Sequence, residues 1–140
     1  MSHVTKIDLN VESLDALKRA CDELGLQFNE GKETFKWYGT HMGDYALPKG
    51  FTKEDMGKCD HSISVPGKPG AYEVGVCKAR DGSDGYELLW DFWNKGYGLE
   101  EALGKDGENL QDEYILCYSE DQLVNDGYIV EREDVQEVGV

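Results

Sequence analysis

The pattern of apolar and polar side chains changes period once near the start of the chain. Residues 3–9 alternate, which predicts a strand with one buried face. From Val11 to Leu24 the apolar residues recur every three or four positions, which is typical of an amphipathic helix. We expect Asn10 to cap this helix and Gly25 to end it in a left-handed conformation.

A hairpin and a long loop are predicted next. Segments 26–28 and 34–38 are apolar and flank Asn29-Glu30-Gly31, a suitable hairpin turn. Residues 39–60 are rich in glycine and have no sustained period, so we expect a long loop or insertion there. Within it, residues 52–56 are expected to form one helical turn. Loops of this length are commonly functional or mobile.

Three further strands are predicted in quick succession. They cover residues 61–65, 71–78 and 85–93. The two segments between them are rich in proline, glycine and aspartate, which favour tight turns. Short turns between successive strands indicate an antiparallel meander.

The last third of the chain leaves one alternative open. Spacing across residues 99–126 fits a helix, yet residues 113–118 also suit a buried strand. A capping-box pattern at residues 119–122 is typical of the start of a second, shorter helix. Asn125-Asp126-Gly127 is expected to end the helix. A short hairpin is then predicted from Tyr128–Glu131 and Val135–Val140.

Together these elements predict an α+β fold. We expect an antiparallel sheet of four or more strands with two main helices packed on one face, in a ferredoxin-like arrangement of layers. With 140 residues the chain is too short for two independent cores, so we expect a single domain over residues 1–140.

The net charge of the chain disfavours some classes of binding partner. The chain has 14 basic and 29 acidic residues, a net charge of -15, and the excess is concentrated in the second half. Residues 1–80 carry 11 basic and 12 acidic residues, whereas residues 81–140 carry 3 and 17. Such a field repels phosphate backbones and anionic lipids, so we expect no direct nucleic-acid binding and no membrane association. The acidic side is then either a solvated surface or one matched to a basic partner.

Cysteine usage and hydropathy indicate a reduced, cytoplasmic protein. The four cysteines form no close pair, and no apolar stretch approaches the ~20 residues that span a bilayer. We expect free thiols, no metal site and no cofactor. Nucleotide-binding loops, nucleophile elbows and zinc signatures are absent from the sequence.

Several segments occur in an order that resembles a known family. They are Lys58-Cys59-Asp60-His61, Tyr72–Val76, Gly85–Trp93 and the helix through Tyr114 that ends at Gly127-Tyr128. This order resembles the hypothetical chloroplast reading frame thirty-five family, a domain of unknown function with plastid, bacterial and phage members. Relative to its shorter members, residues 40–57 look like an insertion. The resemblance implies a fold and no established activity.

Strand alternation selects a candidate binding surface. One face of the meander is apolar and must meet the helices, whereas the other combines carboxylates with an indole. We expect that second face to be open and to bind a partner through Glu73, Glu87, Leu89, Asp91 and Trp93. If Glu73 and Glu87 were neighbours, mutual repulsion would raise one pKa, as in general acid–base pairs.

A possible anion site involves the lysines of the long loop and its neighbours. These are Lys32, Lys36, Lys49, Lys53 and Lys58.

These features lead to three functional hypotheses. We favour a small, acidic, non-catalytic binding or adaptor protein that recognises a protein partner, and the acidic surface would suit a basic one. An alternative is a phage counter-defence protein that imitates nucleic acid or sequesters nucleotides at the lysines. A second alternative is a carboxylate-dependent hydrolase. We expect a monomer or a homodimer, with the monomer favoured because like charges oppose self-association.

Overall fold

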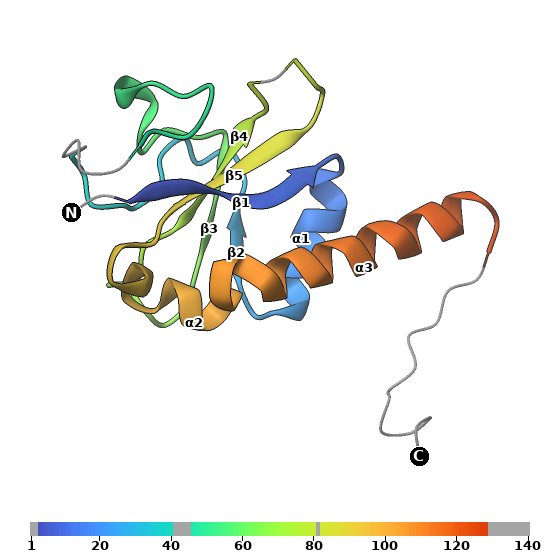
Figure 1. The fold of residues 1–140 in the computed structure, drawn as a ribbon. Helices are drawn as coiled ribbons and strands as arrows, with labels where there is room; N and C mark the ends of the chain where they lie inside the picture. The colour runs from blue at the N-terminus through green and yellow to red at the C-terminus, as the bar shows by residue number, and fades with distance from the viewer. Residues whose placement is uncertain (1–2, 41–45, 81, 129–140) are drawn as a thin grey trace.

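The computed structural model describes residues 3–40, 46–80 and 82–128. Five strands in this part of the chain pair into one antiparallel sheet with the order β1-β5-β4-β3-β2 (Figure 1). The strands are β1 Val4–Val11, β2 Gln27–Asn29, β3 His61–Ser64, β4 Val74–Lys78 and β5 Tyr86–Asp91. The predicted β3-β4-β5 meander is confirmed, and β1 is added beside β5 at the sheet edge.

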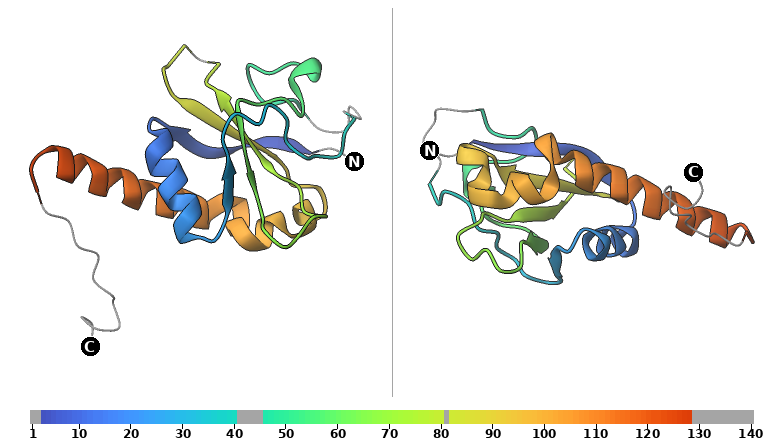
Figure 2. Two further views of the ribbon diagram at one scale, coloured as in Figure 1. Left: turned by 180° about the vertical axis from the view of Figure 1, so that it is seen from behind. Right: turned by 90° about the horizontal axis from the view of Figure 1, so that it is seen from below.

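Helices pack on one face of this sheet (Figure 2). They are α1 Leu14–Glu23, α2 Leu99–Leu103 and α3 Glu108–Asn125. Short 3-10 turns lie at η1 Lys53–Asp55, η2 Trp93–Gly98 and η3 Lys105–Gly107. The α+β prediction is confirmed, and residues 113–118 are helical.

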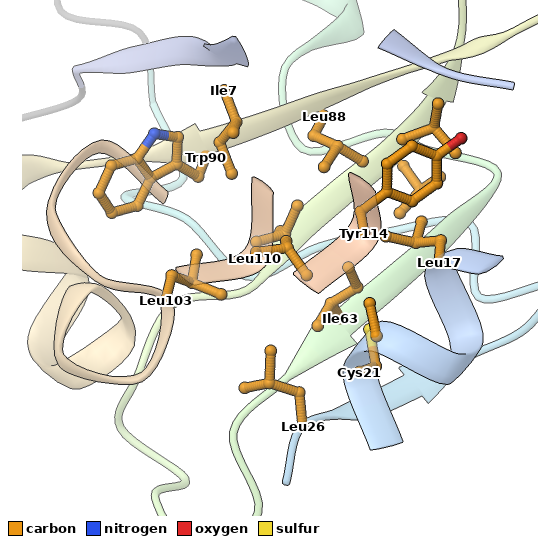
Figure 3. Close-up of a cluster of buried hydrophobic side chains, with 14 of the residues drawn as sticks. Ile7, Leu17, Cys21, Leu26, Ile63, Leu88, Trp90, Leu103, Leu110 and Tyr114 are labelled. Carbon is orange, nitrogen blue, oxygen red and sulfur yellow. The ribbon is translucent and has the colours of Figure 1, made fainter. Parts of the chain in front are cut away.

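The main core lies between the sheet and α1 and α3 (Figure 3). Leu88 and Trp90 of β5 face Leu17 of α1 and Leu110 and Tyr114 of α3, and all five side chains are buried. Alternation along β5 supplies the first two, and helical spacing supplies the other three. The end of α3 extends away from the sheet (Figure 1).

The beginning of α1 differs from the prediction. Its N-cap is Ser13, whose hydroxyl accepts a hydrogen bond from the Ala16 N–H at 3.1 Å. Asn10 lies in β1 because an irregularity between Ile7 and Asn10 lets the strand continue to pair with β5 as far as Val11. The prediction for Gly25 is confirmed, with a φ of 71° after the last turn.

The predicted hairpin between residues 26–28 and 34–38 is wrong. β2 pairs with β3, and Phe28 lies opposite Ile63. Residues 34–38 instead cross the face of the sheet opposite the helices, where Phe35 is buried. Burial of that aromatic ring against the sheet outweighs the local turn signal, which contributes little by itself.

The prediction at the end of the helical region is partly correct. No second helix begins at residues 119–122, because α3 continues through them to Asn125. The helix ends where expected, and Gly127 follows with a φ of 93°. The predicted hairpin of Tyr128–Glu131 and Val135–Val140 lies almost wholly outside the described residues. Across the described ranges, none of the helices combines the length and apolar character needed to cross a bilayer.

Candidate functional site

The predicted binding face exists, but it is not open. Gly75 pairs with Leu89 and Cys77 with Glu87. A second apolar cluster covers this face, and it includes Leu89, which is fully buried. The cover comes from the connection between β2 and β3, through Phe35, Phe51 and Met56. The expectation of an open surface is therefore wrong, because apolar loop residues without a regular period form a layer of their own.

Glu73 and Glu87 do not adjoin. Continuing the β4–β5 register places Glu73 opposite Asp91, four residues from Glu87 along the strand, or roughly 13 Å. Each carboxylate has its own cation. Lys32 Nζ lies 2.9 Å from Glu73 Oε1, and Lys6 Nζ lies 3.0 Å from Glu87 Oε1.

Asp91 is a structural residue. It is fully buried, and its carboxylate accepts three main-chain hydrogen bonds at 3.0 Å. Oδ1 accepts from the N–H groups of His3 and Trp93, and Oδ2 accepts from the N–H of Tyr38. One side chain thus joins the start of the chain, the covering loop and the turn after β5. The Asp91 carboxylate therefore stabilises the fold.

Trp93 lies at the margin of the same region. Its ring is half-buried and meets the His3 ring edge-on, with the centroids 5.1 Å apart. Of the five residues predicted as a binding surface, none presents a widely exposed side chain. Alternation correctly placed Glu87, Leu89 and Asp91 on one face of β5, but it carries no information on what covers that face.

The five lysines of the predicted anion site are exposed, and two have protein partners. Lys32 pairs with Glu73, and Lys36 Nζ donates to the Pro69 carbonyl at 2.8 Å. The other three, Lys49, Lys53 and Lys58, lie within the irregular loop that precedes β3. In the described ranges no three His, Cys, Asp or Glu residues are arranged to hold a metal ion.

Three of the four thiols have raised pKa values. The structure records all four cysteines as free. Burial raises the pKa of Cys21 and of Cys77 to about 12, with smaller contributions from nearby negative groups. Burial likewise raises the pKa of Cys59 to about 12. Because nucleophilic attack requires the thiolate, these three side chains are poor nucleophiles at neutral pH.

An exposed apolar stripe lies along α3. Its members are large apolar side chains that are at least 43% exposed: Ile115, Leu116 and Leu123. The opposite side of the helix is buried through Leu110, Tyr114 and Cys117. Val124 lies seven residues after Cys117 and therefore on the same side of the helix as Cys117, yet it is 56% exposed. It lies near the end of α3, which extends away from the sheet (Figure 1).

A cavity of about 550 Å³ lies beside the edge strand β1, and we call it the β1-edge pocket. Its lining comes from β1, the end of β5 and the helical segments that follow: Thr5, Lys6, Asp8, Trp90, Phe92, Glu100, Asp106, Glu108 and Gln111. The floor contains two aromatic rings, and the walls contain four carboxylates. No local sequence pattern indicates this pocket, because alternation along residues 85–93 places both aromatic residues on the apolar face and Asp8 lies 92 residues before Glu100.

No protein-family model, no curated protein and no solved structure matches this chain.

Proposed function

We propose that this protein is a non-catalytic binding or adaptor protein whose partner is a basic protein. The observation that carries the proposal is the stripe of exposed apolar side chains on an acidic helix. Large apolar side chains gathered on a surface commonly mark an interaction site. α3 contains five acidic residues and neither lysine nor arginine.

The charge around the stripe favours a basic partner. Residues 99–126 contain nine acidic residues and one basic residue. Asp112 lies three residues before Ile115 and four before Leu116, which places all three on neighbouring positions of the helix surface. A partner with apolar side chains flanked by lysine or arginine would complement both features, and the field would accelerate its encounter.

The residues that hold α3 in place are distinct from the stripe. Arg19 of α1 lies 2.9 Å from Glu120 and also contacts Asp121. The Tyr114 hydroxyl accepts hydrogen bonds from the N–H groups of Glu12 and Ser13. Because these contacts fix the helix from its other side, substitutions in the stripe can test binding without removing the support of α3.

The other hypotheses receive less support. A hydrolase would need Glu73, Glu87 and Asp91 to converge. The strand register separates Glu73 from Glu87, and the Asp91 carboxylate already accepts main-chain hydrogen bonds. A nucleotide-sequestering site would need convergent cations, and Lys32 is paired with Glu73. A protein that imitates nucleic acid would use the same acidic surface as the proposed adaptor. The two hypotheses differ in that added DNA should displace a partner that is bound through such imitation.

The test is a pull-down from the native host at low salt. We compare wild type with Ile115→Ser/Leu116→Ser, and we use Tyr38→Ser as the control because Tyr38 is an exposed apolar residue outside α3. Wild type and the control should retain a basic protein that is released by salt, whereas the stripe variant should lose it. Retention of the same proteins by all three, or of none by wild type, would contradict the proposal.

A further inference from the structure

We propose that the β1-edge pocket binds an extended peptide segment and receives one of its lysine or arginine side chains. This inference rests on the proposed function in one respect, since it assumes that the segment belongs to the basic partner. It adds a second contact, separate from the α3 stripe, and it names the chemistry of the group that is bound. Three independent features of the pocket support it.

The first feature is the floor. Trp90 is only 3% exposed, at one end of the buried cluster in Figure 3, and it also lines the pocket. Because Trp90 lines the pocket, its indole N–H is suited to donate to an acceptor on a ligand there, such as a peptide carbonyl. Beside it, the half-buried Phe92 ring offers aromatic surface to a cation.

The second feature is the free edge of β1. The strand has β5 on one side and no strand on the other within the described residues. The Phe92 N–H donates to the His3 carbonyl, so His3 lies at a hydrogen-bonded position. In an antiparallel pair this pattern alternates, so the N–H and C=O groups of Thr5 and Ile7 point toward β5. Those of Lys6 point away from β5, toward the free edge. Lys6 therefore lines the pocket with the main-chain groups that an added strand would pair with.

The third feature is the charge of the walls. Asp8, Glu100, Asp106 and Glu108 contribute four carboxylates to the lining. The one cation among the lining residues, Lys6, directs its ammonium group to Glu87, 3.0 Å away. A negative recess above aromatic rings favours an ammonium or guanidinium group over a neutral or acidic side chain. A lysine or arginine on an added strand satisfies all three features at once.

The experiment uses the full chain and an acetylated, amidated peptide, Thr-Val-Lys-Val-Thr. A second peptide has norleucine in place of lysine, which keeps the chain length and removes the charge. Binding is followed by NMR through the indole N–H of Trp90 and the main-chain N–H of Lys6. We expect both signals to shift with the lysine peptide, with binding weakened about tenfold for norleucine.

Matched variants locate the site. Asp106→Asn/Glu108→Gln removes two carboxylates from the pocket, whereas Asp84→Asn/Glu54→Gln removes two exposed carboxylates that do not line it. We expect the first variant to bind the lysine peptide about tenfold more weakly and the second to remain within about twofold of wild type. Equal weakening of both variants, equal binding of both peptides, or shifts confined to other residues would overturn the pocket assignment.

The two proposals fail in different ways. Loss of peptide binding to the pocket, with a basic protein still retained through Ile115 and Leu116, overturns only the pocket assignment. If wild type retains no basic protein but the peptide still shifts Trp90 and Lys6, the adaptor function fails and the peptide site stands.

Discussion

Asp91 Oδ2 accepts a hydrogen bond from the main-chain N–H of Tyr38 at 3.0 Å, which joins the end of β5 to the loop that covers the sheet. The other oxygen accepts from His3 and Trp93. A buried carboxylate that accepts several N–H groups stabilises the fold only while each donor keeps its acceptor.

Replacement of Asp91 should therefore destabilise the protein strongly. Asp91→Asn puts an amide NH₂ where one oxygen accepts, so at least one buried N–H loses its partner. We expect the free energy of unfolding in urea to fall by roughly 3 kcal/mol. Asp84→Asn, at an exposed aspartate, is the control and should change it by less than about 0.5 kcal/mol. A similar small change for Asp91→Asn would contradict the structural role.

Gly75 should not tolerate a side chain. A Cβ atom there would lie 2.3 Å from Cδ1 of Phe35, which packs directly on the strand. We expect Gly75→Ala to lower the free energy of unfolding by about 1–3 kcal/mol through overpacking. Gly70→Ala is the matched control, because a Cβ at Gly70 would meet nothing within 4 Å. If the two alanine variants are equally stable, Phe35 does not occupy this position.

The Tyr114 hydroxyl should support the beginning of α1. It accepts hydrogen bonds from the N–H groups of Glu12 at 2.9 Å and Ser13 at 3.1 Å. We expect Tyr114→Phe to lower stability by about 1–3 kcal/mol and to accelerate hydrogen exchange at these two amides. Tyr118→Phe, whose hydroxyl donates to Glu12 Oε2 instead, should leave their exchange unchanged. Unchanged exchange in Tyr114→Phe would contradict the assignment.

Stability should decrease at alkaline pH. Burial raises the pKa of the Cys21 and Cys77 thiols from 9.0 to about 12. Between these values the unfolded chain loses the thiol protons while the folded chain retains them, so the stabilisation present below pH 9 is lost as pH rises toward 12. Each thiol contributes at most about 1.4 kcal/mol per pH unit.

Urea unfolding at pH 8, 9 and 10 measures this decrease, and Cys21→Ala is the informative variant. Its stability should be lower than that of wild type at pH 8 because of the smaller side chain, yet it should decline less steeply with pH. Parallel pH profiles for wild type and Cys21→Ala would show that Cys21 titrates alike in the folded and unfolded chain.

The periodicity of apolar side chains predicted individual strands and helices well, but it did not predict which of these elements pair or pack together. Alternation predicted β1 and the strands of the meander, and helical spacing predicted α1, because each pattern reflects burial of one face of a local element. The pairing of β2 with β3 depended on residues far apart in sequence. Phe35 was read as part of a hairpin strand because no local feature distinguishes a buried strand aromatic from a buried loop aromatic.

The sequence by itself determined the fold class, the acidic second half of the chain and which residues share a face of β5. Only the tertiary structure decided which of those faces is accessible. The loop carrying Phe35, Phe51 and Met56 covers the face predicted to be open, since burial of apolar area does not require a regular period. The β1-edge pocket likewise exists only because β1, β5 and the start of α3 meet, and no local pattern specifies where separate elements enclose a space.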